Sequence, residues 1–495
     1  MNTEVNIHQG RVRGQMTEGI ATFKGIPYAA APFGANRFRP PQPAEPWAGT
    51  RDTFAFGPTA PKPPYAPPFD ALLPEPVVPG ADCLNLNIWT PDLGDARLPV
   101  MVWIHGGAFR AGSGAIPTYD GHNFARDGVV CVTLNYRLGV EGFLYLGAGT
   151  ANLGLLDQIA ALEWVHENIA GFGGDPDNVT IFGESAGGMS VTTLLAMPRA
   201  AGLFRRVIAQ SGAGHHAISL ETARLVSQNL ADKLGVAATP EALAEVPRDS
   251  LLQAQVEIGN EAASNPDPQR WGDVALNLMP YEPVIDGELL SALPIQNIAA
   301  GTSTGVELLV GTTTEEYRFF TVPTGAIDLM GEHTLARLCA VYGLPTAEAE
   351  AIYRAAWPDA SPGDLCTAMI TDWFFRIPAM RLAETGVAHD TATYMYEFAW
   401  RTPQLGGRLG ACHALELAFV FDNLHQNANK GLVGPAGPQA IATAMHSAWV
   451  AFATTGNPGW PRYDLVRRAT MLFDTTSQVV GDPHAAERVL WEGRR

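Results

Sequence analysis

The sequence predicts an α/β fold in which helices flank a mostly parallel central sheet. Short apolar runs without strict alternation recur along the chain, as in "LPVMVWIHGG", "GVVCVTLNYR", "NVTIFGES" and "VELLVG". Such runs are typical of strands buried on both faces. Helical patterns such as "LLDQIAALEWVHENI" lie between several of them. Buried strands that alternate with helices favour a parallel sheet.

Composition limits the number of domains and the kinds of partner. The chain has 495 residues, 46% of them hydrophobic, and by length alone could form two to four domains. No internal repeat or composition break divides it, so we expect one domain over residues 1–495. Lys and Arg number 32 against 50 Asp and Glu, a net charge of −18, which argues against nucleic acid or an anionic membrane as partner.

Two features predict a cytoplasmic protein. The first residues, "MNTEVNIHQGRVRGQ", lack a basic region followed by an apolar run, and no stretch reaches the roughly 18 apolar residues of a membrane span. The five cysteines are scattered and odd in number, and none has CxxC spacing. A disulfide framework or a zinc site therefore has little support.

Three segments lie outside the strand–helix rhythm. Residues 1–30 predict short strands that form a flap on the main fold. Residues 57–80 are so rich in proline that we expect an extended surface loop, with a disordered linker as the alternative. Residues 214–300 and 321–390 contain helical stretches that interrupt the strands, and we expect them to be insertions that cover one end of the sheet.

A candidate nucleophile lies in "VTIFGESAGGMS", residues 179–190. The pattern GxSxG alone is weak evidence, but here it follows a buried strand and precedes a helix. A sharp turn at that place lifts Ser185 to the C-terminal end of the sheet, and Gly183 and Gly187 avoid crowding the neighbouring strand and helix. The alternative is an ordinary serine in a tight turn.

A serine nucleophile needs a base, and the base needs an orienting acid. In this architecture the chain order is serine, acid, histidine, with each residue on a loop after a strand. Glu315 and Glu316 follow "VELLVG", and local sequence does not choose between them. His413 follows the strand pattern "ATYMYEFAW" and a glycine-rich turn.

Other histidines rank lower as the base. His446 and His166 lie in helical patterns, where a packed or surface histidine is more common. His215 and His216 follow a strand but precede any candidate acid, so they rank second to His413.

Acyl transfer also needs hydrogen-bond donors for the oxyanion. The segment "WIHGGAF", residues 103–109, ends a buried strand with consecutive glycines, which can turn backbone N–H groups inward. The expected partner is the N–H of the residue after the nucleophile, Ala186. A plain glycine turn is the alternative.

Together these segments resemble the type-B carboxylesterase family of α/β-hydrolases, and most closely its bacterial para-nitrobenzyl esterases. The resemblance covers almost the whole chain and also includes "ADCLNLNIWTPD", "VTLNYRLGVEGFL", "ACHALELAFVF" and "AWVAFATTGNPGWP". It implies an α/β-hydrolase fold with large helical insertions over the active site. It implies a triad and three oxyanion N–H donors at these positions: Ser185 as nucleophile, Glu316 as acid, His413 as base, and Gly107, Ala108 and Ala186 as donors.

The resemblance also implies two buried structural ion pairs, Arg137 with Asp157 and Arg37 with Asp82. There are departures as well. Cys83 has no upstream cysteine with which to form the disulfide of secreted relatives. Tyr317 follows the acid where glycine is usual, and Ala108 replaces a glycine found in some relatives. We expect Ala108 to disfavour bulky tertiary-alcohol esters.

The sequence therefore predicts a serine carboxylesterase that acts on small-molecule esters without a metal or cofactor. An amidase, a carbamate hydrolase or a specialised natural-product esterase remains an alternative, because the same triad attacks all of these carbonyls. A non-catalytic binding protein on the same fold is a remote alternative, since such proteins typically lose the nucleophile. The physiological ester, the pocket residues and the choice between monomer and dimer stay open.

Overall fold

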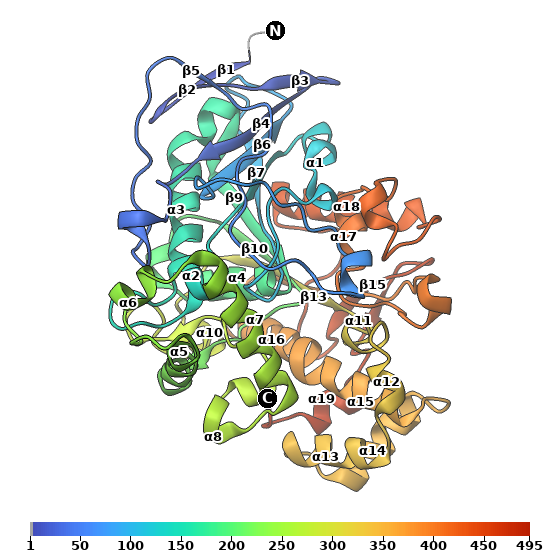
Figure 1. The fold of residues 1–495 in the computed structure, drawn as a ribbon. Coiled ribbons are helices and arrows are strands. Elements are labelled where there is room, and N and C mark those ends of the chain that lie inside the picture. Colours follow the sequence, from blue (N-terminus) through green and yellow to red (C-terminus); the bar gives the residue numbers. More distant parts are fainter. Residues whose placement is uncertain (1–2) are drawn as a thin grey trace. The chain divides into compact units, whose positions relative to one another are not determined.

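The computed structural model describes residues 3–495, which divide into two compact units. The first unit comprises residues up to 65, 75–208 and 215–306. The second comprises residues 66–74, 209–214 and 307–495. Figure 1 draws both units as a ribbon and labels many of their helices and strands. The organisation as one domain stays a prediction.

The first unit contains a small sheet, part of a large sheet and a short parallel pair. Its strands are β1 (Glu4–Ile7), β2 (Gly10–Arg13), β3 (Gln15–Thr17), β4 (Ile20–Pro27), β5 (Thr50–Asp52), β6 (Asn85–Thr90), β7 (Leu98–Ile104), β8 (Val130–Leu134), β9 (Gly174–Glu184), β11 (Ile218–Ser219) and β12 (Val284–Ile285). Strand β10 (Arg206–Gln210) begins in this unit, and its last two residues open segment 209–214 of the second.

The strands that precede the candidate nucleophile pair in parallel. Strand β7 lies between β8 and β9 and is parallel to both, whereas β6, β4 and β3 extend the sheet through antiparallel pairs. Strands β1, β2 and β5 form the small sheet, so residues 1–30 contain the short strands that the sequence predicts. The pairing of Ile104 with Gly183 brings the chain after β7 beside the chain after β9.

Helices pack on both faces of these strands. In β7, Val100 to Ile104 are fully buried, as are all residues of β8, which confirms strands covered on both sides. Helix α1 packs on β4, β6 and β8, whereas α3 and α4 pack on β9, and Figure 1 shows α1 and α3 on opposite sides of the strands. The helices of this unit are α1 (His122–Arg126), α2 (Gly139–Phe143), α3 (Leu153–Asn168), α4 (Ala186–Leu195), α5 (Leu220–Leu234), α6 (Pro240–Ala244), α7 (Arg248–Ser264), α8 (Pro268–Trp271), α9 (Val274–Asn277) and α10 (Pro294–Ala299), with 3₁₀ turns at Gly34–Asn36, Pro117–Tyr119, Ile169–Phe172 and Pro198–Ala200.

The second unit is built on a parallel sheet with one antiparallel edge. Strands β13 (Glu307–Thr313), β14 (Thr393–Phe398) and β15 (Ala469–Phe473) pair in parallel, and β16 (Gln478–Gly481) pairs antiparallel with β15. The helices are α11 (Arg318–Thr321), α12 (Ala326–Leu329), α13 (Glu332–Val341), α14 (Thr346–Ala356), α15 (Pro362–Thr371), α16 (Ile377–Ala388), α17 (Leu417–Val420), α18 (Gln439–Thr455) and α19 (Ala485–Leu490), with 3₁₀ turns at Phe69–Ala71, Gln404–Gly407 and Asn427–Asn429.

Alternate residues of β14 serve two different layers. Tyr396 packs edge-on against Trp449 of α18, with ring centroids 5.0 Å apart. Its neighbour Glu397 points the other way, as the period of a strand requires, and contacts Arg376 and His484. Arg376 closes a π-helical segment, Asp372–Arg376, between α15 and α16.

One of the two expected buried ion pairs forms as the resemblance implies, and the other does not. Arg137 and Asp157 are both fully buried, and Arg137 Nη2 lies 2.6 Å from Asp157 Oδ1. The expectation for Arg37 is wrong. Arg37 Nη2 lies 2.8 Å from Glu141 of α2, whereas Asp82 is exposed.

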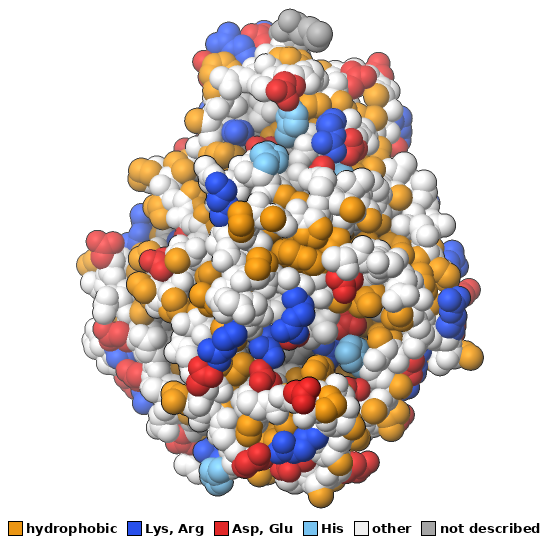
Figure 2. Space-filling view, turned by 90° about the vertical axis from the view of Figure 1, so that its right-hand side faces the viewer, with side chains coloured by type: hydrophobic (Ala, Val, Ile, Leu, Met, Phe, Trp, Pro, Cys, Tyr) orange, Lys and Arg blue, Asp and Glu red, His pale blue; other side chains and the backbone are white. Residues whose placement is uncertain are grey.

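The cysteines, the surface charges and the lengths of the helices can be compared with the expectations from composition. All five cysteines are free and buried. Figure 2 shows acidic and basic side chains interspersed with apolar ones on one face. None of the helices in residues 3–495 is both long and apolar enough to cross a bilayer.

Candidate active site

Ser185 occupies a strained turn between a strand and a helix. Strand β9 ends at Glu184 and α4 begins at Ala186, so Ser185 alone connects them. Its backbone has φ 57° and ψ −126°, a conformation that residues with a side chain rarely adopt and that costs about 1–3 kcal/mol. A Cβ at Gly183 would lie 2.5 Å from the Gly187 carbonyl carbon, and one at Gly187 2.0 Å from Ile104 O. Both glycines are therefore required by close backbone packing.

The glycine-rich segment after β7 runs directly beside this turn. A Cβ at Gly106 would lie 2.6 Å from Glu184 O and 3.0 Å from Cβ of Ser185, so the two segments are in contact. Gly107 and Ala108 follow with φ values of 111° and 51°. Ala186 begins α4, where free backbone N–H groups favour negative charge. The first unit thus holds Ser185 and all three predicted oxyanion donors.

His105 of the same segment does not have the properties of a catalytic base. Its Nδ1 lies 2.8 Å from Gly106 O, and its ring stacks on Tyr136 with centroids 4.5 Å apart. Burial lowers the pKa of His105 to about 3, so the imidazole stays neutral near pH 7. It is a structural residue of the loop.

Glu316 and His413 form a buried pair in the second unit. Glu316 Oε2 lies 2.6 Å from His413 Nδ1, and Glu316 Oε1 accepts a hydrogen bond of 2.8 Å from Thr313 N–H. Glu316 is fully buried and His413 is 4% exposed. Both carboxylate oxygens are thus occupied, and the contact at Nδ1 fixes the orientation of the His413 imidazole.

Aromatic rings surround the His413 imidazole. The ring centroids of Phe375, Phe320 and Phe319 lie 4.8, 5.3 and 6.1 Å from that of His413. These rings limit the orientations of the imidazole and lower the local dielectric constant, which strengthens its interaction with Glu316.

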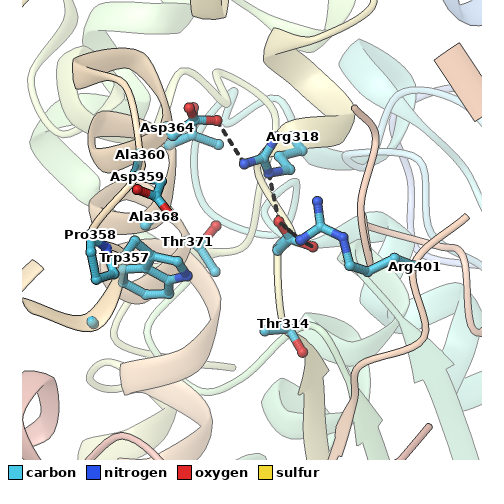
Figure 3. Close-up of a pocket in the computed structure, with 13 residues that line it drawn as sticks. Thr314, Arg318, Trp357, Pro358, Asp359, Ala360, Asp364, Ala368, Thr371 and Arg401 are labelled. Carbon is cyan, nitrogen blue, oxygen red and sulfur yellow. Dashed lines mark hydrogen bonds and ion pairs between the residues drawn. The ribbon is translucent and has the colours of Figure 1, made fainter. Parts of the chain in front are cut away.

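Glu315 points away from His413 into a separate set of contacts. Arg318 Nε and Arg401 Nη1 lie 2.8 and 2.7 Å from its carboxylate oxygens, and Ala411 N–H donates to it at 3.0 Å. It helps to line a pocket of about 310 Å³, in which Trp357 lies across from Arg318 and Arg401 (Figure 3). Of the described residues, those that line this pocket include neither Glu316 nor His413.

Tyr317 fits the loop that carries Glu316, at a position where the resemblance leads us to expect glycine. Its φ is −76° and its ψ is −8°, a right-handed helical conformation that any residue adopts. Its N–H donates to Thr371 Oγ1 at 3.1 Å, and its ring packs against Phe320. Burial raises the pKa of Tyr317 to about 12, so its hydroxyl stays protonated.

The lower-ranked histidines have other environments. His446 is buried in α18 with its Nδ1 2.7 Å from Val420 O, and His166 is exposed in α3. His215 and His216 belong to the first unit, whereas the Glu316 carboxylate in the second unit is occupied by His413.

Comparison with known proteins identifies the family to which this chain belongs. Residues 1–481 match the model of a family described as "Carboxylesterase family". The chain belongs to the carboxylesterase family. It is therefore a carboxylic ester hydrolase, and its mostly parallel sheet flanked by helices is the α/β-hydrolase fold.

Relatives of this carboxylesterase cover nearly its whole length. It is 39% identical to the para-nitrobenzyl esterase of Bacillus subtilis, over 98% of the chain and 97% of that protein. It is 34% identical to the phenmedipham hydrolase of Pseudarthrobacter oxydans, over 96% and 94%. The crystal structure of Geobacillus stearothermophilus carboxylesterase EST55 matches with a TM-score of 0.87 and 42% identity, covering 99% of this chain and all of the other.

Sequence reasoning missed the side chains that support the carboxylesterase's candidate residues. Phe375, which packs on His413, and Arg401, which contacts Glu315, come from segments distant from Glu315 and Glu316, whereas Arg318, Phe319 and Phe320 follow the two carboxylates within five residues. A weak signal exists for Lys62 and Glu75, two charged residues within the proline-rich segment 57–80. That segment has no helix or strand beyond the 3₁₀ turn Phe69–Ala71, as the proline content predicts. The expectation of a loop that lies entirely on the surface is wrong, because Lys62 is buried.

Proposed function

We propose that the carboxylesterase hydrolyses small-molecule carboxylic esters through an acyl-enzyme on Ser185. The observation that carries this proposal is the buried Glu316–His413 pair, whose atoms lie 2.6 Å apart. The strained turn that presents Ser185 supports it from the first unit. Glu316 fixes the tautomer of His413 through Nδ1, which leaves Nε2 as the proton acceptor.

The proposed reaction has two halves. His413 Nε2 takes the Ser185 proton while Ser185 Oγ attacks the ester carbonyl, and the N–H groups of Gly107, Ala108 and Ala186 stabilise the oxyanion. The C–O bond to the alcohol then breaks, and His413 returns the proton to the leaving alcohol. Water next attacks the acyl-enzyme in the same way, and the carboxylic acid leaves with Ser185 restored.

We propose carboxylic esters as the substrate class and name no individual ester. Relatives bear names as different as para-nitrobenzyl esterase, phenmedipham hydrolase and fumonisin B1 esterase, which supports a family scaffold with varied substrates. Amides, carbamates and natural-product esters are the alternative substrates, because the same groups attack their carbonyls. Ser185, Glu316 and His413 are all retained, which counts against a non-catalytic binding protein.

The setting of the enzyme is also a proposal. We place it in the cytoplasm of a bacterium, because five free, buried cysteines suit a reducing compartment. The net charge of −18 supports a small molecule as partner and opposes nucleic acid and anionic membranes. Both a monomer and a dimer are compatible with these features.

The decisive experiment combines one substitution with one probe. We expect Ser185→Ala to fold and to lose esterase activity by several orders of magnitude, and a fluorophosphonate to label the wild type at Ser185 alone. Ser190→Ala, one turn further along α4, is the matched control and keeps labelling at Ser185. Near-normal turnover of Ser185→Ala, or labelling at another residue, would overturn the assignment.

A substrate series separates the alternatives. Para-nitrophenyl esters of increasing acyl length, esters of bulky alcohols, and matching anilides and carbamates should be compared by kcat/KM. Hydrolysis of the aryl esters without activity on the anilides supports the esterase. Faster hydrolysis of anilides or carbamates than of matched esters would favour the corresponding alternative.

A further inference from the structure

The loop that carries the proposed oxyanion donors holds an unfavourable backbone conformation. Gly107, Ala108 and Phe109 have consecutive positive φ values of 111°, 51° and 57°. Ala108 and Phe109 have side chains, so each left-handed residue is strained. Such strain persists only where surrounding contacts hold it, and those contacts decide where the N–H groups of Gly107 and Ala108 point.

A carboxylate from a distant segment fixes the end of this loop. The N–H groups of Arg110 and Ala111 donate to Gly107 O, each at 3.0 Å, and close a turn. The next N–H, that of Gly112, leaves the turn and donates to Glu75 Oε2 at 2.8 Å. A Cβ at Gly112 would lie 2.4 Å from Gly106 O, so the two ends of the loop are in direct contact.

Glu75 is held in turn by a buried lysine. Lys62 Nζ lies 3.0 Å from Glu75 Oε1, and the two side chains are only 2% and 7% exposed. Burial lowers the pKa of Lys62 and raises that of Glu75, and each charge offsets this effect on the other. Buried ion pairs contribute little net stability, because desolvation consumes most of the Coulomb attraction. A role in geometry is therefore the better explanation for this pair.

We propose that Lys62 and Glu75 are positioning residues of the oxyanion hole. Lys62 keeps the Glu75 carboxylate in place, and Glu75 anchors Gly112 N–H, which fixes the turn on which the N–H groups of Gly107 and Ala108 are carried. This inference rests on the proposed function, since it concerns the oxyanion donors assigned there. All of its contacts lie within the first unit.

The pair should affect the transition state more than substrate binding. Oxyanion donors act when negative charge develops, and loss of one donor in comparable enzymes lowers kcat about 10²–10³-fold. Glu75→Ala frees the loop without deleting a donor, so we expect kcat to fall about 10- to 100-fold with KM within about threefold of wild type. Affinity for an aryl trifluoromethyl ketone, whose adduct with serine carries an oxyanion, should fall in parallel with kcat/KM.

A double variant separates positioning from folding. In Lys62→Met with Glu75→Gln both charges are removed together, and the side-chain amide oxygen introduced at position 75 still accepts from Gly112 N–H. We expect this variant to keep kcat within about fivefold of wild type. Glu257→Ala removes a partner from the partly exposed Lys233–Glu257 pair, whose atoms lie 3.0 Å apart, and serves as the control with unchanged kcat.

The outcomes are distinct. Equal kcat and ketone affinity in Glu75→Ala and wild type would overturn the proposal, as would a double variant as impaired as Glu75→Ala. If Glu75→Ala does not fold, Lys62→Met with Glu75→Leu, which removes both charges and also the acceptor for Gly112 N–H, takes its place. A kcat about 10- to 100-fold below that of Lys62→Met with Glu75→Gln supports the proposal, and equal kcat in the two double variants overturns it. Fluorophosphonate labelling of the wild type separates failure of the proposed function from failure of this inference. Labelling away from Ser185 refutes the proposed function, whereas labelling at Ser185 with an unaffected Glu75→Ala refutes only this inference.

Discussion

Glu316 Oε2 lies 2.6 Å from His413 Nδ1, whereas the neighbouring Glu315 contacts Arg318, Arg401 and the backbone of Ala411. The two adjacent carboxylates thus have different partners, so substitution of one should affect the esterase rate differently from substitution of the other.

The first prediction concerns these two carboxylates. Glu316→Gln should lower kcat by about 10⁴ with little change in fold, because an amide favours the wrong tautomer of His413. Glu315→Gln should stay within about tenfold of wild type, since its amide oxygen still accepts from Ala411 N–H. Steady-state kinetics with a para-nitrophenyl ester measures both. If Glu315→Gln is the more damaged variant, the acid assignment moves by one residue.

The second prediction concerns the thiols. All five cysteines are free and buried, and burial raises the pKa of the Cys412 thiol beside His413, with Glu316 adding to the effect. A thiol reductant should therefore change neither the esterase rate nor the melting temperature. Differential scanning fluorimetry with and without reductant checks this. A drop of several degrees on reduction would show a disulfide.

The third prediction is a pH dependence of stability. Burial and Arg376 lower the pKa of His484, but its contacts with Glu397 and Glu487 outweigh them and raise it to about 9. The pKa of Glu397 is lowered to about 2, so this carboxylate stays charged. An unfolded histidine has a pKa of about 6.5. Protonated His484 therefore stabilises the folded state fully below pH 6.5, and the contribution is lost as pH rises through 9.

The size of this effect can be measured directly. The difference between the two pKa values corresponds to about 3 kcal/mol. The denaturant midpoint of unfolding should be measured at about pH 6 and at about pH 9.5 for both proteins. We expect the difference between the two midpoints to be smaller in His484→Gln than in wild type. His166→Gln, at an exposed histidine of α3, is the control and should keep the wild-type dependence. An unchanged pH dependence in His484→Gln would contradict the prediction.

Much of the fold follows from local pattern. The apolar runs predict β7, β8, β9 and β13 because burial on both faces leaves a continuous apolar signature. The elbow at Ser185 is predictable because close packing leaves no room for side chains at Gly183 and Gly187. Chain order then selects His413, because each predicted site residue follows a strand.

The rest depends on contacts between distant segments. The choice between Glu315 and Glu316 is set by side-chain direction after β13, which local sequence does not encode. The pairing of Arg37 with Glu141 rather than Asp82 depends on where α2 lies. The π-helical segment Asp372–Arg376 places Arg376 next to Glu397 of β14. Its residues follow the pattern of an ordinary amphipathic helix, so the sequence alone does not reveal the π-helical turn.

The spacing between strand ends and helical segments has an evolutionary consequence. Ser185 directly follows β9, and Glu316 comes three residues after β13, whereas α5 to α10 and α12 to α16 begin further along the chain. Changes of length in those helices can therefore arise without shifting Ser185 along β9 or Glu316 along β13. Thr371 and Phe375 are the exceptions, because their contacts with Tyr317 N–H and the His413 ring tie the segment from α15 to α16 to the candidate site, so this segment should tolerate the least change in length.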